Sequence, residues 1–214
     1  MLSSRQLSPL IVLSIALWVI GALLAGADLT LAGNLLRPIG PVLFVVGTVL
    51  TAFDLWLWHC GILYPWFVDR PDLRGTWRAT FVSSYVPPGE NEPVGPLEAR
   101  IVIRQTFSSL HIRMLTAESS SNTVGATVSR EPDGSHLILG VYQNRPREEV
   151  TPRSSMHVGA MWLAGDGRLP DVLRGFYWTN RATRGDLTLG SRERELLSSF
   201  EPTNGDAATD EGIH

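Results

Sequence analysis

The sequence predicts a membrane α-helical hairpin followed by an all-β domain, a small up-and-down β-barrel of about eight strands. Three features predict this fold class: two long uncharged apolar segments near the N-terminus, a later series of short alternating segments bounded by turn residues, and no amphipathic helix among those segments. The 214 residues are enough for one domain and an extra module. We therefore expect residues 1–69 to form a two-helix transmembrane hairpin, 70–195 a cytosolic β-barrel, and 196–214 a disordered acidic tail.

Two apolar segments form the expected hairpin. The first runs from about Leu7 to Ala25 and is longer than the roughly 7–15 apolar residues of a signal peptide, the competing interpretation. The second runs from about Ile39 to Leu63 and follows Pro38, which suits a helix start. Spans of about 20 apolar residues can cross a hydrocarbon core of roughly 30 Å, so we expect both segments to span a membrane.

The basic residues near the two segments predict their orientation. Four lie on the outer flanks and one lies in the connecting loop: Arg5, Arg70, Arg74 and Arg78 against Arg37. Because basic residues favour the cytoplasmic side, we expect a multi-pass protein of the bacterial inner membrane with both termini in the cytoplasm. Aromatic residues gather at the end of the second segment, as in an interfacial belt: Trp56, Trp58, Tyr64 and Trp66.

Asp54 is the one acidic residue within the second apolar segment. A charge in hydrocarbon costs about 2.5–3.5 kcal/mol on insertion scales. In one interpretation, Asp54 lies near the interface, where it reaches water or is hydrogen-bonded to a neighbour. In the other, it contributes to a membrane or oligomer contact between subunits, or to an aqueous path. The sequence leaves both open.

Eight segments after Pro71 are rich in Val, Ile, Thr and aromatic residues, and turn residues bound most of them. They are 75–85, 98–106, 109–117, 121–130, 135–144, 154–164, 172–180 and 184–190. Regular short strands separated by turns are typical of a sandwich or an up-and-down barrel. An eight-stranded barrel is either filled by side chains or holds one small ligand.

The motifs of several enzyme classes are absent from the sequence, which has no P-loop, no GxGxxG after a strand, no HExxH and no GxSxG. Cys60 is the single cysteine, and the histidines at 111, 136 and 157 lack ligand-like spacing. The formal net charge of −3 does not favour DNA or RNA as a partner. We expect neither catalysis nor a metal or other cofactor.

A stripe of residues near the C-terminus shares one strand face: Gly175, Tyr177, Thr179 and Arg181, with Thr183 and Gly185 at the same parity. For Arg181 the sequence leaves open a solvated rim charge or a cation at a pocket mouth that meets an anion. For Tyr177 and Trp77 it leaves open barrel core or stacking on a base. Nearby strands add Tyr142, Asn144 and His157, although a histidine there is more often part of a core.

Five segments carry a resemblance to a known family. They are LRGTW at 73–77, LHIRMLTAESSS at 110–121, Y-x-N-x-P at 142–146, HVG at 157–159 and LRGFYWTNRATRGDLTL at 173–189. The last contains a G-x-Y-x-T-x-R-x-T-x-G pattern. With the two N-terminal apolar segments, they make the chain resemble, over about residues 5–190, the SMODS-associating two-transmembrane β-strand-rich effectors of bacterial CBASS antiphage systems.

The resemblance implies an antiphage effector whose barrel binds a cyclic oligonucleotide, made by a partner cyclic-nucleotide synthase encoded nearby. Binding would promote self-association and disruption of the membrane lipid, which stops the infected cell. The candidate ligand-binding residues are Trp77, Tyr142, Asn144, His157, Tyr177, Thr179, Arg181 and Thr183. The main alternative is a non-catalytic membrane-anchored β-barrel binding or scaffold module of the cell envelope, and a membrane enzyme with an unrecognised site is a third possibility.

Overall fold

The computed structural model describes residues 15–16, 18–20, 39–86, 89–152 and 154–200. The chain divides into two compact units, residues 1–69 with 106–108 and residues 70–105 with 109–214. Most of the first predicted apolar helix, the loop after it, and the tail from 201 onward lie outside the described residues. The positions of the two units relative to one another are not determined, so each is described by itself.

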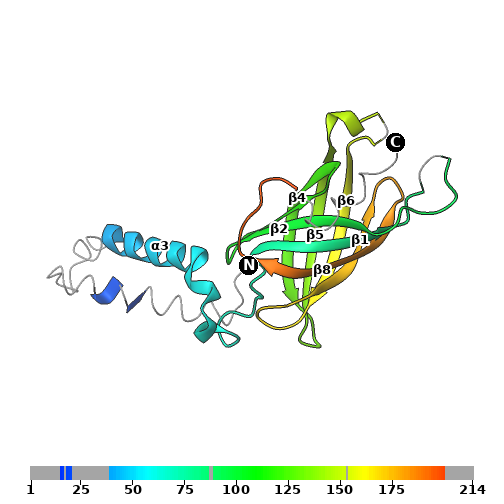
Figure 1. Ribbon diagram of the computed structural model, residues 1–214. Helices are drawn as coiled ribbons and strands as arrows, with labels where there is room; N and C mark the ends of the chain where they lie inside the picture. Colours follow the sequence, from blue (N-terminus) through cyan, green and yellow to red (C-terminus); the bar gives the residue numbers. More distant parts are fainter. Residues whose placement is uncertain (1–14, 17, 21–38, 87–88, 153, 201–214) are drawn as a thin grey trace. The chain divides into compact units, whose positions relative to one another are not determined.

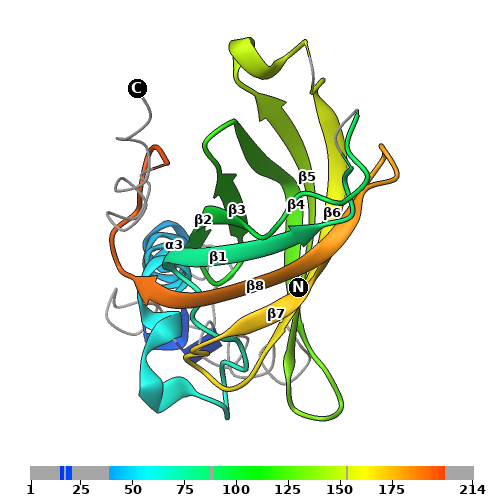
Figure 2. The same cartoon turned by 45° about the vertical axis from the view of Figure 1, so that its right-hand side comes forward.

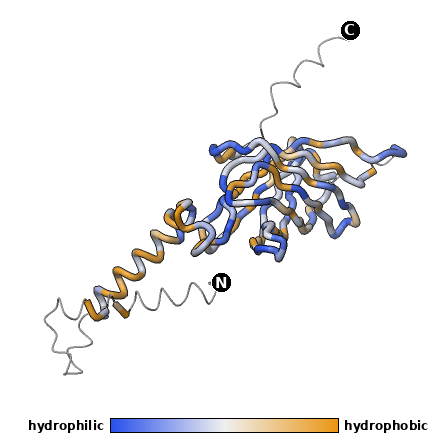
Figure 3. The backbone as a smooth tube through the Cα atoms, turned by 90° about the horizontal axis from the view of Figure 1, so that it is seen from below, coloured by the Kyte–Doolittle hydropathy of each residue, from blue (hydrophilic) through white to orange (hydrophobic). Residues whose placement is uncertain are grey.

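The second predicted apolar helix is shorter than expected. Helix α3 covers Ile39–Leu55 and is apolar along its length (Figure 3). Two 3₁₀ turns follow, η1 (Leu57–His59) and η2 (Gly61–Leu63). Between them Cys60 has an extended backbone with φ −63° and ψ 127°, a conformation that an α-helix does not contain. Among the described residues, no helix has both the length and the apolar character needed to cross a bilayer.

A small aromatic cluster explains why the chain leaves the helix after Leu55. Trp58 is 1% exposed and packs in a cluster with Val68 and Phe107, whereas Trp56 and Trp66 are 62% and 71% exposed. The two 3₁₀ turns after the helix place the Trp58 indole against Val68 and Phe107. Trp58 is therefore buried within the unit, whereas Trp56 and Trp66 are exposed, and the aromatic belt stays a prediction.

Asp54 has a hydrogen-bond partner in the first unit. Its Oδ1 accepts from the backbone N–H of Ser108 at 2.8 Å, and its backbone carbonyl accepts from the N–H of Phe107 at 3.0 Å. The Phe53 and Phe107 rings meet edge to face, with centroids 5.0 Å apart. The carboxylate therefore anchors residues 106–108 within the unit, which supports the interpretation that Asp54 is bonded to a neighbour.

The second unit is a closed antiparallel barrel in which each strand pairs with the next and β8 pairs with β1 (Figures 1 and 2). Its strands are β1 (Gly75–Ser83), β2 (Leu97–Gln105), β3 (Leu110–Leu115), β4 (Ser119–Arg130), β5 (His136–Pro146), β6 (His157–Gly165), β7 (Leu173–Thr179) and β8 (Arg184–Glu193). A further turn, η3 (Glu148–Val150), lies between β5 and β6. The predicted eight-stranded barrel is confirmed.

Strict alternation of side chains decides which residues fill the barrel. On β6, Gly159, Met161 and Leu163 are buried inside, while the residues between them lie on the outer face. Successive strand residues point to opposite faces, so a period of two in the sequence becomes one apolar wall. The interior core also contains Trp77, Ile101, Ile103, Ile112, Ile138, Leu173 and Leu189.

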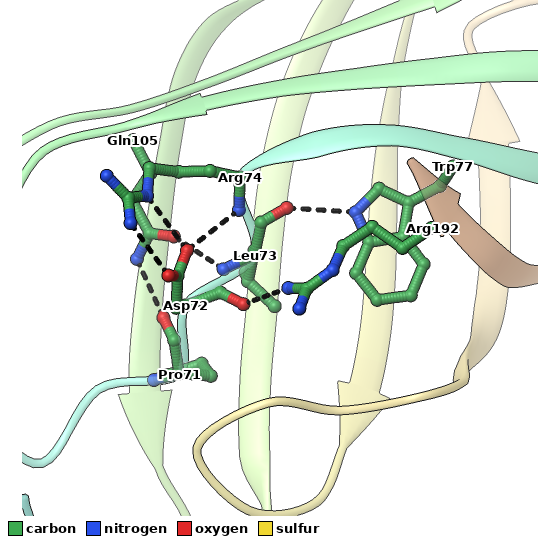
Figure 4. Close-up of polar contacts among 7 residues, drawn as sticks. All are labelled: Pro71, Asp72, Leu73, Arg74, Trp77, Gln105 and Arg192. Carbon is green, nitrogen blue, oxygen red and sulfur yellow. Dashed lines mark hydrogen bonds and ion pairs between the residues drawn. The ribbon is translucent and has the colours of Figure 1, made fainter. Parts of the chain in front are cut away.

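One end of the barrel is closed by polar contacts around Trp77 (Figure 4). The Trp77 Nε1 donates to the Leu73 carbonyl at 2.9 Å, and Gln105 bonds the backbone of Pro71 and Leu73, also at 2.9 Å. The Arg192 guanidinium lies 5.3 Å from the centroid of the Trp77 ring. These bonds satisfy buried backbone groups of the segment that enters β1, so this end is packed rather than open.

The outer face of β1 and β2 is covered by the residues that follow β8. The Thr76 hydroxyl donates to the carbonyl of Glu195 and accepts from the N–H of Leu197, and the Phe200 ring lies 5.7 Å from the Arg100 guanidinium. Thr76 and Arg100 point outward yet are only 3% and 6% exposed. The first residues of the predicted disordered tail therefore pack on the barrel, and the rest lies outside the described residues.

Candidate functional site

The other end of the barrel holds a cavity of about 540 Å³. Side chains from all eight strands line it, together with residues of the β5–β6 connection such as Val150 and Ser154. Small-molecule sites are typically concavities of roughly 300–1,000 Å³ with an apolar lining and a few polar groups. The cavity has this size and this composition.

The deep part of the cavity is aromatic and apolar. The Tyr177 ring meets Phe81 edge to face at a centroid distance of 6.1 Å, and Tyr142 and Met161 pack in the same core cluster. Burial raises the pKa of Tyr177, an effect that a hydrogen bond to Ser83 partly offsets. Neutral phenol rings on a dry wall offer flat faces for stacking a planar ligand.

Two glycines make room for the tyrosine rings. A Cβ on Gly159 would lie 2.5 Å from the Tyr142 hydroxyl and 2.6 Å from its Cζ. A Cβ on Gly185 would lie 2.8 Å from a ring carbon of Tyr177 and would collide with the Val82 carbonyl. The glycines of the HVG segment and of the G-x-Y-x-T-x-R-x-T-x-G pattern therefore position aromatic rings and permit close strand pairing.

Tyr142 is a largely buried residue that lines the cavity. The residue is 4% exposed, and its ring and hydroxyl lie next to Gly159. Burial raises the pKa of Tyr142 well above its usual value, and the neighbouring Tyr177 adds to the effect. A tyrosine that lines the cavity can offer its ring and its hydroxyl to a bound ligand.

A polar side of the cavity is built on β4, β5 and β6. The Ser121 hydroxyl donates to Asn144 Oδ1 at 2.9 Å, and the two side chains are 2% and 5% exposed. The Asn144 amide nitrogen lies 3.5 Å from Nδ1 of His157. With its oxygen engaged by Ser121, the Asn144 amide presents N–H donors toward the cavity and His157.

The mouth of the cavity carries a cation on the turn between β7 and β8. Arg181 Nη1 donates to the Ser154 hydroxyl at 3.0 Å and to the Ser155 carbonyl at 3.4 Å, and lies 3.4 Å from His157 Nδ1. The turn is held by a 2.6 Å bond between the hydroxyls of Thr179 and Thr183. Because these bonds already hold the guanidinium in place, it can bind an anion instead of the neutral Ser154 and Ser155 oxygens with little further loss of side-chain entropy.

His157 is neutral over more of the pH range than a free histidine. Burial lowers the pKa of His157, and the positive charge of Arg181 lowers it further, while the bond to the Ser155 carbonyl opposes both. An anion beside Arg181 would reverse the second effect, because negative charge favours the imidazolium. The pair can therefore respond to a ligand phosphate together.

Seven of the eight residues predicted to bind a ligand line this one cavity: Tyr142, Asn144, His157, Tyr177, Thr179, Arg181 and Thr183. Trp77 does not, because it belongs to the packed closed end, and we remove it from the candidate set. Sequence reasoning missed Phe81, Ser121 and the contribution of Ser154. Phe81 has the parity of Trp77 on β1, but parity does not say which of the two lies at the open end.

The lining residues suit binding rather than a known type of catalysis. In the described part of the chain, no group of three or more His, Cys, Asp or Glu side chains is placed to hold a metal ion. The charged side chains of the lining are Arg181 at the mouth with Glu98 and Glu118. Aromatic faces at depth with one guanidinium at the mouth match a ligand that has planar and anionic parts.

Comparisons with known proteins point to the same class of ligand. A family model described as "Cap15, cyclic dinucleotide receptor domain" matches residues 68–191, a range that contains β1 to β7 and most of β8. The CD-NTase-associated protein 15 of Staphylococcus schleiferi is 29% identical over 136 residues, which are 63% of this chain and 67% of that protein. These findings support the broader part of the resemblance, to CBASS effectors, and its two-transmembrane part stays a prediction. Because this family model matches more than half of the chain, the protein belongs to the family of Cap15 cyclic dinucleotide receptor domains.

Proposed function

We propose that the protein is a membrane-held antiphage effector whose barrel binds a cyclic dinucleotide in the cavity at its open end. The observation that carries the proposal is the cavity itself, in a chain of the receptor family. It combines two tyrosine side chains, Tyr142 and Tyr177, in its wall with a guanidinium at the mouth. A cyclic dinucleotide carries planar bases and two phosphates. The cavity has aromatic rings at depth that suit a base and a guanidinium at its mouth that suits a phosphate.

The ligand would lie with a base inside and a phosphate outside. A base would stack on the rings of Tyr142 or Tyr177, which is worth roughly 1–3 kcal/mol per base. A phosphate at the mouth would replace Ser154 as the acceptor of Arg181, and hydrogen bonds to charged groups contribute about 1.5–3 kcal/mol each. Asn144, with donors toward the cavity, would bond an acceptor of the base or the sugar.

The membrane part of the proposal concerns the first unit. Helix α3 exposes large apolar side chains on several sides, among them Leu43 at 66% and Phe44 at 74%. Such a helix is normally covered by lipid or by other apolar helices. We place the N-terminal segments in the bacterial inner membrane with both termini in the cytoplasm, where a nearby cyclic-nucleotide synthase would supply the ligand. Binding would promote self-association of the chain and disruption of the lipid bilayer.

The cavity favours this proposal over the scaffold alternative. A scaffold module needs only a barrel filled by its own side chains, as the end around Trp77 is. The opposite end holds about 540 Å³ of space with polar groups turned toward it, which a filled scaffold would not retain.

Ligand binding tests the proposal directly on the full chain in detergent micelles. Titration calorimetry and thermal unfolding would be run with cyclic di-GMP, cyclic di-AMP and cyclic UMP–AMP, with the linear dinucleotide pGpG as the ligand control. A cyclic dinucleotide at 100 times its dissociation constant should add about 2.7 kcal/mol to the free energy of unfolding. Loss of one charge-assisted bond in Arg181→Ala should weaken binding by at least about ten-fold.

Arg104→Ala is the matched control, because Arg104 is exposed and faces outward from β2. It removes the same charge without touching the cavity and should keep the wild-type affinity. The proposal is wrong if no cyclic dinucleotide binds, or if the two arginine variants lose affinity equally. The output is tested by ligand-triggered release of a dye from vesicles that contain the full chain.

A further inference from the structure

The outer face of β5, β6 and β7 carries an exposed apolar patch. Five large side chains of the patch are 36–54% exposed: Leu139, Val141, Val158, Phe176 and Trp178. The Phe176 ring stacks on Trp162 with centroids 5.4 Å apart and planes 18° apart, and it lies 5.7 Å from Trp178. The strand register makes the patch continuous, since Leu139 pairs with Trp162, and Ala160 pairs with both Val141 and Trp178.

This patch contrasts with the outer face of β1 and β2, where the chain covers its own surface. There Thr76 points outward but is only 3% exposed, and it is bonded to Glu195 and Leu197 after β8. Over the patch, the described residues provide no such cover. Its exposed area is on the order of 400 Å², which is the size of the largest apolar patch on a typical monomer, and such patches are often functional.

Charged side chains of both signs border the patch on β7 and β8. Arg184 pairs with Trp178, Asp186 pairs with Phe176, and Arg174 lies two residues before Phe176. All three are exposed, and within the described part of the chain their side chains make no ion pair. An anionic lipid surface would favour a purely basic border, because a carboxylate beside it is repelled.

We propose that this face is a surface on which a second copy of the chain docks. A symmetric contact places residue i against j and j against i, so a border with both signs can pair with itself across the two-fold axis. The available area is about half of the roughly 800 Å² that each partner buries in a standard interface. Association through this patch is therefore weak in dilute solution and becomes significant when copies are concentrated.

The same strands carry the cavity on their other face. Tyr177 lines the cavity and lies between Phe176 and Trp178, which point outward, and Met161 lies inside next to Trp162. A shift of Tyr177 on ligand binding would thus move two side chains of the docking surface through one strand of backbone. This coupling rests on the proposed function, whereas the docking surface itself does not require a ligand.

Site-directed cross-linking tests the surface on the full chain in lipid nanodiscs that hold more than one copy, and in vesicles. In a Cys60→Ser background, Val158→Cys reports on the patch and Arg104→Cys reports on the far outer face of β2. A short bis-maleimide should cross-link Val158→Cys into dimers and leave Arg104→Cys monomeric. Equal yields at the two positions, or no dimer at Val158→Cys, would overturn the proposal.

A disruptive variant separates docking from folding. Trp178→Arg should weaken association, measured by native mass spectrometry from micelles, by at least about ten-fold. Leu169→Arg is the matched control, since Leu169 is also 45% exposed and lies in the β6–β7 connection. Cyclic di-GMP, cyclic di-AMP and cyclic UMP–AMP report on the cavity: whichever binds the wild type should still bind the Trp178→Arg monomer, which would show that its barrel is folded. Unchanged association of Trp178→Arg, or an equal loss in Leu169→Arg, refutes the docking surface.

Two further outcomes keep the proposals apart. If copies associate through the patch but none of these cyclic dinucleotides binds, the docking surface stands and the proposed function fails. An environment-sensitive dye on Val158→Cys tests lipid as the occupant: quenching by brominated lipids without cross-linked dimer would assign the face to the bilayer and overturn the proposal.

Discussion

Replacement of Gly159 by alanine would test the role of the glycines in the cavity wall. A Cβ at this position would lie 2.5 Å from the Tyr142 hydroxyl, 2.6 Å from its Cζ and 2.6 Å from the backbone carbonyl of Trp178. Ordinary contacts of a Cβ begin near 3.4 Å, so the ring, the neighbouring strand or both must move by several tenths of an ångström. Backbone cannot give way as a flexible side chain can.

The expected cost is that of overpacking, about 1–3 kcal/mol in the free energy of unfolding. For a barrel of this size, that corresponds to a decrease of several degrees in Tm, roughly 3–6 °C per kcal/mol. Because the displaced group is the Tyr142 ring, the affinity for a cyclic dinucleotide should also fall. Stability and binding thus change together in this variant.

Gly190→Ala is the control, because a Cβ there meets nothing within 4 Å and the glycine is also on a barrel strand, β8. Both variants would be measured by thermal and urea unfolding of the full chain in micelles, followed by calorimetry with the ligand. Gly159→Ala should be clearly less stable than Gly190→Ala. If the two variants unfold alike and bind alike, the glycine does not position Tyr142 and the steric argument is refuted.

Three other predictions concern His157, Trp77 and Asp54. Burial lowers the pKa of His157 in the folded protein below 6.5, so its contribution to stability is complete above pH 6.5 and is lost as the pH falls through the lowered value. His157→Gln should flatten the loss of stability below pH 6.5, and an unchanged pH profile would contradict this. Trp77→Phe leaves the Leu73 carbonyl without its donor, so it should cost about 1–3 kcal/mol in the free energy of unfolding while the ligand affinity stays within two-fold. A large loss of affinity without destabilisation would return Trp77 to the binding site. Asp54→Leu removes the acceptor of the Ser108 N–H and should accelerate hydrogen exchange at that amide, whereas Asp54→Asn should keep the amide protected. Equal exchange in the two variants would show that the bond is unimportant.

The sequence by itself determined the strands of the barrel and the face on which each side chain lies. Alternation with period two and the turn residues between segments are local signals, so the expected segments lie within a few residues of the observed strands. The shared parity of Tyr177, Thr179, Arg181 and Thr183 also brought four residues to one cavity. The resemblance to CBASS effectors agrees with the family to which the chain belongs.

The position of a side chain along the barrel axis was decided only by the tertiary structure. Trp77 and Phe81 have the same parity on β1, yet Trp77 is sealed in the closed end and Phe81 lines the cavity. A period of two specifies inside or outside, whereas depth depends on the stagger of the neighbouring strands and on what plugs each end.

The tertiary structure also decided which groups find partners far along the chain. Apolar residues continue to Leu63, but α3 ends at Leu55 because Trp58 joins a cluster with Phe107, and Asp54 bonds Ser108. On the barrel, Val102 is buried and Trp178 is exposed, although both side chains point outward from a strand. Local composition encodes the preference of a segment for strand or helix, but burial depends on contacts between residues distant in sequence, and those exist only once the chain has folded.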